Sequence, residues 1–600
     1  MPGIMGFTRL DPRNEGDRAS IERMRDAMVY GSEHVGDPLF IDSRICAART
    51  STVVGHFRTQ PYVEAGIHVW LDGEILADSR NPGLDRHEKI DGARILASGF
   101  LDDEGHGFLQ HLNGIYAAAV YDSKREKIHL VSDRYGLRHL NWSVWNGRLV
   151  WASELKALLE LPDFQARIDR NALEEFLGLD WLLKDRTWFE GVELLSPATV
   201  LTWDLNRGTA ERTRYWSWES IRPLPRQINE SEAAEELGRR FRQAVSRRIR
   251  DDERVGVTLS GGLDSRAILA ATPSSEEPSE PLHAVTFCRP HCDDARIAAM
   301  AVRVRKNTVH HLVELNSANW FPPRVAAVWW TDGRKDLKHM AILTAYDRAR
   351  HLFNYVLDGA GAAAIKGIDV RGSADPILLL KKRFGCDIRA NSSLDRRVRE
   401  YAKETGSIYE ILLDSRVRSF NINGPKLATF MGMEYRLPFL DNDFQEFWCA
   451  LPTTLRMDSR VGFQMLVETF PEFFRRIPWQ RTGAPISVPV VAQQVWKFVN
   501  RIKYRMYRDL SRLGVPVQVA HNLTDYPNWL RAEPARTFVN DLFTSSRAIY
   551  PDFISRNQVL GDWERHLSGS DHSTTVCKYL TLELWLQQIY EKKYRNGVGT

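Results

Sequence analysis

Ten residues near the middle of the chain have the types and spacing of a site that holds phosphate groups. The string Val257-Thr-Leu-Ser-Gly-Gly-Leu-Asp-Ser-Arg266 follows an apolar run that starts at Val255 and leads into an alternating Leu/Ala/Ile stretch. This order predicts a buried strand, a tight turn and then a helix. Two adjacent glycines let successive backbone N–H groups point inward, and the helix N-terminus adds a positive field. The turn is therefore suited to an anion such as pyrophosphate.

Side chains of the same turn add donors and a metal ligand. Ser260 and Ser265 supply hydroxyl groups, and Asp264 is expected to bind the Mg²⁺ that accompanies a nucleoside triphosphate. The string Ser-Gly-Gly-Leu-Asp-Ser resembles the pyrophosphate loop of the N-type ATP pyrophosphatases, which cleave ATP to AMP and pyrophosphate. The sequence has no G-x-x-x-x-G-K-[ST] motif. The resemblance thus implies that an acceptor is adenylated, rather than that the γ-phosphate is transferred.

Composition sets wider limits on the function. Six hundred residues favour two or more domains, and the net charge of +4 gives no case for a nucleic-acid partner. No run approaches 18 apolar residues and no apolar signal region begins the chain, so no membrane association is expected. Six scattered cysteines predict reduced thiols in a cytoplasm. Cys288 and Cys292 flank His291 and predict a loop with two free thiols, with a structural zinc as the alternative.

The first 210 residues predict an antiparallel, sandwich-like domain. Short β-like runs alternate there with turn residues such as Asp72-Gly73 and Asn146-Gly147. The predicted strands cover His68–Leu71, Tyr116–Tyr121, Ile128–Val131, Leu149–Trp151 and Thr199–Trp203. Residues 211–230 become polar and proline-bearing, which indicates a linker.

Residues 231–600 predict a second domain of α/β class. Ser231 to Ile249 has a helical period, with Ser231 as the expected N-cap. Apolar runs at His283–Phe287 and Asn354–Leu357 join the strand before the loop, so strands and helices alternate. Such alternation predicts a parallel sheet whose ligands collect at the carboxyl ends of its strands. The basic stretch Lys497 to Arg512 predicts a solvated helix face, with a partner-docking surface as the alternative.

Nearly the whole chain resembles the asparagine synthetase family, which joins a glutamine-amidotransferase-like domain to a synthetase domain. The resemblance is carried, in chain order, by the segments Leu112–Ala119, Ser132–Arg138, Trp151–Ala157 and Met433–Asp441. It implies that ATP and Mg²⁺ are used by the C-terminal domain. The fold expected is a mixed α/β chain, with an antiparallel β-sandwich first and a parallel-sheet ATP pyrophosphatase-type domain second.

The chain departs from the family at its glutaminase nucleophile. Such glutaminases need a cysteine as the mature N-terminal residue, because its amine assists the thiol. Here Pro2 stands in that place before a preserved Gly-Ile-x-Gly frame. Arg49 keeps the position that the family uses for the glutamine carboxylate, whereas Asp72 replaces an asparagine. Glutamine hydrolysis by the family mechanism is therefore excluded, and the attacking amine is expected to belong to the substrate.

A second departure lies in the loop that aligns with the family's Ser-Gly-Glu-Gly-Ala-Asp-Glu. The chain reads Asp358-Gly-Ala-Gly-Ala-Ala-Ala364, so Ala360 replaces the catalytic Glu and Ala363 replaces a Mg²⁺-binding Asp. Asp358 is a candidate to replace that metal ligand. Without this base, an enzyme that joins two groups of one substrate could depend on holding the attacking amine against the acyl-adenylate. Proximity alone supplies much of the rate of such a reaction.

Two offshoots that lack the cysteine resemble the chain further, namely β-lactam synthetase and the lasso-peptide cyclases. Ser265-Arg266 and the segment Ile477–Gly483 look most like the cyclases. That resemblance implies adenylation of an Asp or Glu side chain of a precursor peptide, whose α-amine then closes a macrolactam. It also implies a leader-binding protein and a leader peptidase as partners. The alternatives are an amide ligase that uses free ammonia or a small amine, and a non-catalytic scaffold of the same fold.

The resemblance assigns further roles to individual residues. The phosphates and Mg²⁺ are assigned to Ser260, Gly261, Gly262, Leu263, Asp264 and Ser265, the adenine to Leu259 and Val285, and the opposite side of the nucleotide to Asp358 and Gly359. Arg481 takes the place of the family's catalytic lysine, which stabilises charge on the phosphate. Arg266 is a candidate to steer a carboxylate or a phosphate, with a surface ion pair as the alternative. Glu434 is expected to be structural, paired with Arg436 or a neighbour.

Overall fold

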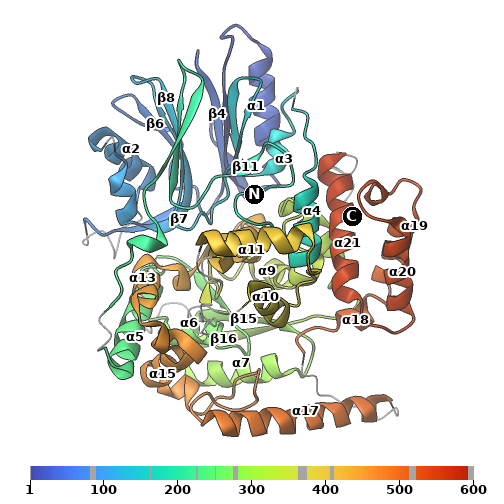
Figure 1. The fold of residues 1–600 in the computed structure, drawn as a ribbon. Helices are drawn as coiled ribbons and strands as arrows, with labels where there is room; N and C mark the ends of the chain where they lie inside the picture. Colours follow the sequence, from blue (N-terminus) through green and yellow to red (C-terminus); the bar gives the residue numbers. More distant parts are fainter. Residues whose placement is uncertain are drawn as a thin grey trace.

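The computed structural model describes residues 2–81, 90–103, 105–162, 164–224, 228–250, 252–273, 281–362, 375–405, 411–512 and 522–591. We call the residues up to 224 the N-terminal region and those from 228 onward the C-terminal region. In Figure 1 the N-terminal region forms the upper part of the molecule and the C-terminal region the lower part, with its last helices along one side.

The N-terminal region contains two antiparallel sheets that face each other. Among the described residues one sheet has the order β11-β9-β10-β1-β4-β2, with β3 also paired to β4, and the other has the order β13-β12-β8-β7-β6-β5. The strands are β1 (Gly3–Thr8), β2 (His34–Gly36), β3 (Phe40–Ile41), β4 (Ile45–Thr52), β5 (Tyr62–Glu64), β6 (Ile67–Asp78), β7 (Leu112–Asp122), β8 (Lys127–Ser132), β9 (Asn141–Trp145), β10 (Arg148–Ala152), β11 (Glu193–Leu194), β12 (Thr199–Asp204) and β13 (Thr209–Arg214). The predicted sandwich is confirmed, and each of its five predicted strands lies within an observed one.

The C-terminal region is built around a parallel sheet. Its order in the described residues is β16-β15-β14-β17-β18, with every pair parallel. The strands are β14 (Val255–Thr258), β15 (Leu282–Cys288), β16 (Thr308–Glu314), β17 (Tyr355–Leu357) and β18 (Glu434–Arg436). Thr258 is in register with Val285, and Val257 with Leu357. The three segments that follow β14, β15 and β17 therefore leave the sheet at one edge, as predicted.

Helices accompany the sheets of both regions. Those of the N-terminal region are α1 (Gly16–Asp26), α2 (Gly92–Asp102), α3 (Leu155–Leu158) and α4 (Arg170–Leu179). Those of the C-terminal region are α5 (Glu230–Ser246), α6 (Asp264–Ala271), α7 (Asp293–Val304), α8 (Pro322–Trp330), α9 (Ile342–Ala349), α10 (Pro376–Phe384), α11 (Ser393–Thr405), α13 (Asn442–Ala450), α14 (Thr453–Arg456), α15 (Arg460–Thr469), α16 (Pro471–Phe474), α17 (Val490–Arg512), α18 (Tyr526–Trp529), α19 (Ala535–Thr544), α20 (Arg556–Leu567) and α21 (Ser573–Trp585). Within the described ranges, no helix has the length and apolarity needed to span a membrane.

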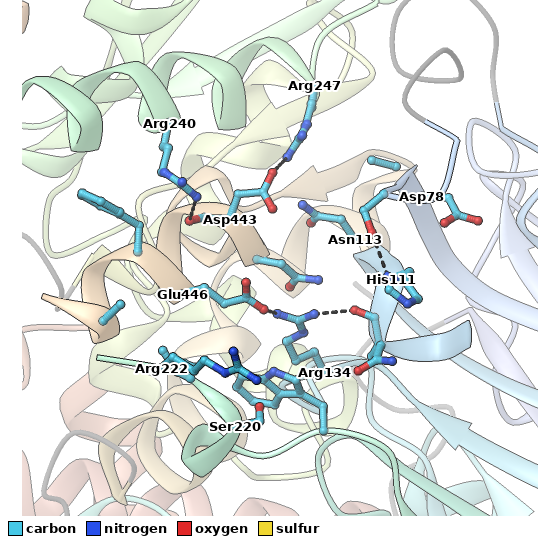
Figure 2. Close-up of a pocket in the computed structure, with 18 of the residues that line it drawn as sticks. Asp78, His111, Asn113, Arg134, Ser220, Arg222, Arg240, Arg247, Asp443 and Glu446 are labelled. Atoms are coloured by element: carbon cyan, nitrogen blue, oxygen red, sulfur yellow. Dashed lines mark hydrogen bonds and ion pairs between the residues drawn. The ribbon is translucent and has the colours of Figure 1, made fainter. Parts of the chain in front are cut away.

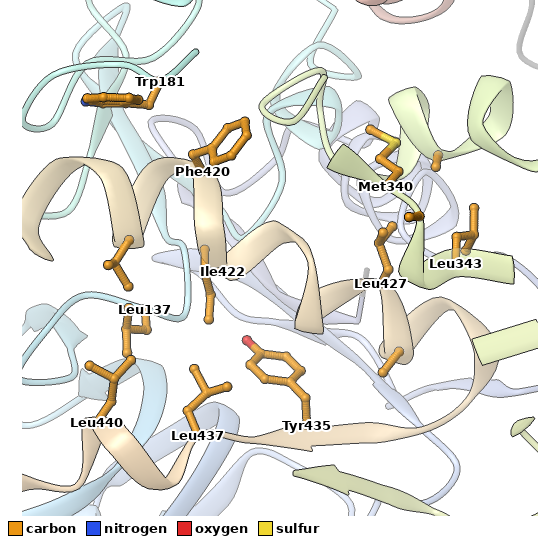
Figure 3. Packing of buried hydrophobic residues seen from close by; sticks show 14 of the residues in the cluster. Leu137, Trp181, Met340, Leu343, Phe420, Ile422, Leu427, Tyr435, Leu437 and Leu440 are labelled. Atoms are coloured by element: carbon orange, nitrogen blue, oxygen red, sulfur yellow. The ribbon is translucent and has the colours of Figure 1, made fainter. Parts of the chain in front are cut away.

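One hydrophobic core crosses the boundary between the two regions. Leu137 and Trp181 of the N-terminal region belong to the same buried cluster as Phe420, Ile422 and Leu440 of the C-terminal region (Figure 3). Such continuous burial gives a favourable free energy of association, because apolar surface of both regions leaves water together. The two regions are therefore packed as one body rather than joined only through the chain between them.

Aromatic stacking adds a second contact between the regions. Trp188 stacks on Trp585 of α21 with 4.7 Å between ring centroids, and both side chains are buried. The indole N–H of Trp188 donates to the carbonyl of Asp332 at 2.7 Å, which satisfies its polar group away from water. The last long helix of the chain thus holds the N-terminal region in place.

The start of α5 differs from the sequence prediction. The N-cap is Asn229 rather than Ser231, and its side chain accepts from the backbone N–H of Glu232 at 2.8 Å. The Glu232 side chain accepts in return from the backbone N–H of Asn229, which completes a capping box. The prediction chose Ser231 because of its helix-start preference, but Asn229 has the same preference and the correct three-residue spacing to Glu232.

We expect Asn229→Ala to loosen the first turn of α5, whereas Ser231→Ala leaves it unchanged. Loss of an N-cap side chain costs about 1 kcal/mol, which corresponds to roughly fivefold faster exchange of the amides it protects. Hydrogen–deuterium exchange of the peptide that contains residues 229–235 measures this. A larger effect from Ser231→Ala than from Asn229→Ala would contradict the assigned cap.

Candidate active site

The loop after β14 is shaped by its own hydroxyl groups. The backbone N–H of Ser260 donates to Ser265 Oγ at 3.0 Å, and that of Gly262 donates to Ser260 Oγ at 3.1 Å. The two hydroxyl oxygens lie 3.1 Å apart. Since α6 begins at Asp264, these groups gather at a helix N-terminus, where an anion is stabilised. The structure thus gathers Ser260, Gly262 and Ser265 at one helix N-terminus, and their role in binding phosphate stays a prediction.

Asp264 opens α6 and Asp358 follows β17, and the two segments meet beside this loop. A Cβ placed on Gly359 would lie only 3.0 Å from Asp264 Cβ. A side chain at residue 359 would therefore crowd Asp264 and push the two segments apart. Asp358 accepts from Thr258 Oγ1 at 3.1 Å and from the backbone N–H of Ala360 at 2.8 Å. The two aspartates predicted as metal ligands are thus neighbours.

The charge of this pair explains what it could bind. Burial raises the pKa of Asp358, and the negative charge of Asp264 raises it further, against hydrogen bonds that lower it. Two such carboxylates fit a divalent cation, because Mg²⁺ prefers oxygen ligands and cancels their mutual repulsion. In the part of the chain that the structure describes, no group of three or more His, Cys, Asp or Glu is placed to hold a metal. Remaining ligands would thus come from substrate phosphates and water.

Asp294 is a member of the site that the sequence prediction missed. It lies in the first turn of α7, and its Oδ1 accepts from the backbone N–H of Gly261 at 2.8 Å. The missed signal is a pair of carboxylates, Asp293 and Asp294, just after the neighbouring strand β15. In a parallel sheet that position lies at the same edge as the loop.

Arg266 connects the loop to residues 473–478 through hydrogen bonds to backbone carbonyls. Its side chain is buried, and its guanidinium donates to four backbone carbonyls, those of Gly261 and Pro478 at 3.0 and 2.9 Å and those of Phe473 and Ile477 at 3.3 and 3.1 Å. Burial lowers its pKa to about 10, so it stays charged at neutral pH. These contacts fit a positioning residue, rather than the steering of a carboxylate or the surface ion pair considered from the sequence.

Arg481 belongs to the segment that Arg266 ties to the loop. The backbone N–H of the preceding residue, Gln480, donates to the carbonyl of Gly261 at 3.2 Å. Arg481 itself is exposed, and its guanidinium lies 5.7 Å from the centre of the Trp479 ring. The residue therefore stands beside the loop with its side chain at the surface. The predicted role of Arg481, to stabilise charge on the phosphate, stays a prediction, and a position beside the loop is compatible with it.

Lys335 and Tyr346 line the interior next to Asp358, and no sequence motif marked either of them. Burial lowers the pKa of Lys335 to about 8, although the charges of Asp336 and Asp358 act in the opposite direction. Burial and the carboxylate of Asp358 raise the pKa of Tyr346 well above its usual value. Within the described ranges the Tyr346 hydroxyl has no hydrogen-bond partner. The interior beside Asp358 is therefore polar but shielded from water.

The residues predicted to flank the adenine also lie at this edge. The backbone N–H of Leu259 donates to the carbonyl of Val285 at 2.8 Å, and both side chains are buried. Leu263, which precedes α6, is buried too, so its side chain belongs to the core beneath the loop. Ala360 is partly buried next to Asp358, whereas Ala363 lies outside the described residues.

Arg49 and Asp72, which the resemblance placed at a glutamine site, both form ion pairs within the protein. Arg49 donates to Asp37 Oδ2 and to the carbonyl of Leu71, both at 2.8 Å. Asp72 lies 3.4 Å from Arg138, which also donates to Glu434 Oε2 at 2.6 Å. The two groups that would meet a glutamine are thus engaged within the protein.

Glu434 is structural, as predicted, but its partner differs. It accepts from Arg138 and from Thr52 Oγ1 at 2.7 Å, both in the N-terminal region. Arg436 instead pairs with Glu74 and Glu253. The sequence prediction named Arg436 or a neighbour as the partner of Glu434. The correction is due to ion pairs with distant residues, which the local sequence cannot show.

The two cysteines near His291 form no metal site in the described residues. Cys288 ends β15 and Cys292 precedes α7, and both are buried free thiols. The two thiols are free as predicted, but Cys288 belongs to a strand rather than to the expected loop.

A cavity of about 680 Å³ lies elsewhere, at the junction of the two regions (Figure 2). Its walls come from β7, from α5 and from α13, and they include the ion pairs Arg134–Glu446 and Arg247–Asp443. Residues 259–266 and 358–360 do not line it. The cavity is therefore separate from the loop and does not compete with it as the nucleotide site.

We expect Asp358→Asn to raise the thermal stability of the metal-free protein at neutral pH. The folded-state pKa of Asp358 is raised, so its stabilising contribution is complete below the unfolded value of 3.8 and is lost as the pH rises through the folded value. The gain in Tm from the variant should thus be largest at neutral pH and shrink toward pH 4. Thermal unfolding in EDTA measures it, with the exposed Asp252→Asn as control. An unchanged Tm at neutral pH would contradict the proposed repulsion between Asp358 and Asp264.

Comparisons with known proteins give this geometry a family context. Residues 93–216 match the model of a glutamine amidotransferase domain, and residues 236–407 match that of asparagine synthase. Asparagine synthetase [glutamine-hydrolyzing] 3 of Bacillus subtilis is 35% identical over 299 residues, which cover 47% of each chain. Asparagine synthetase [glutamine-hydrolyzing] 2 of the same organism is 28% identical over 290 residues, 45% of this chain and 38% of the relative. Amidase chyE of Penicillium rubens is 30% identical over 168 residues, 27% of this chain and 24% of the relative.

The chain spans about half the length or less of these curated relatives. Both matches nevertheless fall in the order of the sheets in the structure: the amidotransferase match lies on the antiparallel sheets and the synthase match on the parallel sheet. The chain thus carries, in this order, a segment similar to a glutamine amidotransferase domain and a segment similar to asparagine synthase, as expected of an asparagine synthetase-like protein.

Proposed function

We propose that the chain is an ATP-dependent lasso peptide cyclase. It would adenylate an Asp or Glu side chain of a precursor peptide, release pyrophosphate, and close a macrolactam with the peptide's N-terminal amine as AMP leaves. One combination of features carries the proposal. The pyrophosphate-type loop is complete and is held in shape by Ser260 and Ser265, while Pro2 and the ion pairs of Arg49 and Asp72 leave no place for glutamine hydrolysis.

The loop residues supply the first half of this reaction. The substrate carboxylate attacks the α-phosphorus, and pyrophosphate leaves toward the N-terminus of α6, where backbone N–H groups and the hydroxyls of Ser260 and Ser265 stabilise its charge. Asp264 and Asp358 would hold Mg²⁺, which neutralises phosphate charge when it is bound. Gly359 keeps those two carboxylates close together.

Arg481 would act in the second half. Amine attack on the acyl-adenylate produces a tetrahedral intermediate with a negative oxygen, and a guanidinium stabilises such charge without giving up its proton. The segment around Gln480 fixes the arginine beside the loop through the carbonyl of Gly261. Because Ala360 cannot accept a proton, we attribute much of the rate to the position of the amine within the folded peptide.

The remaining parts of the proposal concern domains and partners. Residues 1–210 would be a scaffold retained from an amidotransferase, residues 211–230 a linker, and residues 231–600 the synthetase domain. A leader-binding protein would deliver the precursor peptide and a leader peptidase would free its amine. Reaction in a reducing cytoplasm suits the free thiols of the chain.

A second candidate function is an amide ligase that uses free ammonia or a small amine. The two Bacillus subtilis relatives, both named as asparagine synthetases, favour it. A third candidate is a non-catalytic scaffold, which the alanine at residue 360 favours.

One assay separates the three candidates. The protein is incubated with Mg²⁺ and ATP, together with either aspartate and ammonia or a leader-free peptide that carries a free N-terminal amine and a ring-forming Asp or Glu. The cyclase proposal predicts AMP and a peptide product lighter by one water, only with the peptide. AMP and asparagine from the first mixture would establish the amide ligase instead. Absence of ATP binding in calorimetry would establish the scaffold.

We expect Asp264→Ala to abolish AMP formation, because it removes one of the two carboxylates assigned to Mg²⁺. The matched control is Asp252→Ala, at an exposed carboxylate away from the loop. AMP release in the presence of peptide is the measurement, and circular dichroism shows whether the variant folds. AMP release at the wild-type rate would contradict the assignment of Asp264 as a metal ligand.

We expect Arg481→Ala to lower the rate of ring closure by about 10²–10³, the usual cost of removing one group that stabilises a developing oxyanion. ATP binding should remain within a few fold of the wild type, since the loop itself is unchanged. Arg475→Ala, at an exposed arginine of the same segment, serves as the control. Equal cyclisation rates for Arg481→Ala and the wild type would exclude the arginine from the reaction.

A further inference from the structure

Helix α17 exposes an apolar stripe along its outer side. We define the stripe as Val491, Val495, Phe498, Val499, Ile502 and Met506, whose exposed fractions lie between 52% and 75%. Val490 and Trp496 flank it and are exposed as well. Among the described residues, eight of the seventeen large exposed hydrophobic side chains lie on this one helix. Such a concentration marks an interaction surface, whereas single exposed apolar residues do not.

The opposite side of α17 is polar and faces the protein. Gln493 is buried, Asn500 Nδ2 donates to the carbonyl of Thr482 at 3.1 Å, and the Tyr504 hydroxyl donates to Asp293 Oδ2. An ordinary surface helix has the reverse arrangement, with its apolar stripe turned to the core. In Figure 1 α17 lies along the lower margin of the molecule, below α7. Its stripe is therefore available for a partner.

The spacing of the stripe fits a second helix. Val491, Val495, Phe498 and Ile502 are separated by four, three and four residues, which is the seam of a two-stranded coiled coil. Over its 23 residues the helix is about 35 Å long. A neighbouring helix of similar length would cover the whole seam.

We propose that the stripe binds α17 of a second copy of this chain, with the two helices antiparallel about a two-fold axis. In this register Val491 of one copy packs against Ile502 of the other, and Val495 packs against Phe498. All four layers are then apolar, and the same patch serves both copies, as a two-fold interface requires. Arg501 lies on the edge of the seam and faces Gln494 of the other copy, so like charges do not meet there.

A parallel pair is less favourable for a physical reason. It would align each residue with itself, and the next seam position after Ile502 is Arg505. Two arginines would then face each other at the end of the seam, and like charges in contact are destabilising. The antiparallel register leaves Arg505 outside the four layers, where water can reach it.

The extent of the stripe is sufficient for a stable dimer. Its six side chains expose several hundred square ångströms, of the order of the ~800 Å² that each partner buries in a standard interface. Phe498 and Met506 are residue types enriched at the centres of protein interfaces. The area thus agrees with a dimer rather than a brief encounter.

The interface would also rest directly on the candidate active site. Asn500 binds Thr482, which follows Arg481, and Tyr504 binds Asp293, which precedes the loop ligand Asp294. A partner that covers the outer side of α17 would therefore fix the helix, and with it the segments that contain Arg481 and Asp294. The dimer does not depend on which reaction the chain catalyses, so the cyclase proposal and the dimer proposal can fail separately.

Sedimentation velocity of the full chain over a concentration series tests the dimer. The wild type should sediment as a species of twice the chain mass of 68.9 kDa. Phe498→Glu should raise the dissociation constant at least about tenfold, because it places a carboxylate in the apolar seam. Leu10→Glu, at an apolar residue that is 64% exposed elsewhere, should leave the dimer intact. A wild type that is monomeric throughout, or a dimer unaffected by Phe498→Glu, would overturn the proposal.

Disulfide trapping tests the register. Val495→Cys and Phe498→Cys chains, each with Cys449→Ser to remove the only partly exposed native thiol among the described cysteines, are mixed and oxidised. The antiparallel register predicts that the mixture crosslinks faster than either chain alone, whereas a parallel pair would crosslink each chain with itself. If the wild type is instead monomeric and floats with anionic vesicles, the stripe is a membrane surface and the dimer is excluded.

Discussion

The candidate site depends on one buried guanidinium. Arg266 reaches across from α6 to four carbonyl oxygens, one in the loop and three in the segment Phe473–Pro478 more than 200 residues away. Burying a charge costs several kcal/mol unless hydrogen bonds satisfy it, and the four carbonyls do so. The loop that would bind phosphate and the segment that carries Arg481 are thereby fixed to one another. Substituting a shorter cation would leave some of these carbonyls without a donor, since lysine lacks the planar set of N–H groups.

Ion pairs brace the N-terminal region against the C-terminal region. Arg138 joins Asp72 to Glu434 at the start of β18. Lys156 is fully buried and lies 3.0 Å from Asp332 of the C-terminal region. Burial alone would raise the pKa of Asp332, yet the Lys156 ammonium brings it below its usual value. Charges that would be costly in isolation are thus paired across the boundary between the two regions.

Sequence patterns predicted what is local and periodic. The alternating strands, the strand–turn–helix at Ser260 and the shared edge of β14, β15 and β17 follow from hydrophobic period and from the rules of parallel sheets. Contacts set by distant residues did not follow. Nothing near Arg266 in the sequence indicates its carbonyl acceptors, and nothing near Glu434 indicates Arg138. The inverted α17 was also missed, because a period shows that a helix has two faces but not which of them meets the protein.

Under the proposed cyclase reaction, the alanine at residue 360 has different consequences for different amines. A peptide α-amine has a pKa near 7.7–8.0, so about half of it is neutral at pH 8, whereas a lysine-type amine with a pKa near 10.4 is almost wholly protonated. Only the neutral amine attacks an acyl-adenylate. A site in which Ala360 cannot take a proton therefore discriminates in favour of an N-terminal amine, provided that the peptide holds it in position. This argument links the alanine to the type of nucleophile, and it makes the N-terminal amine of a peptide a better match to the site than a more basic small amine.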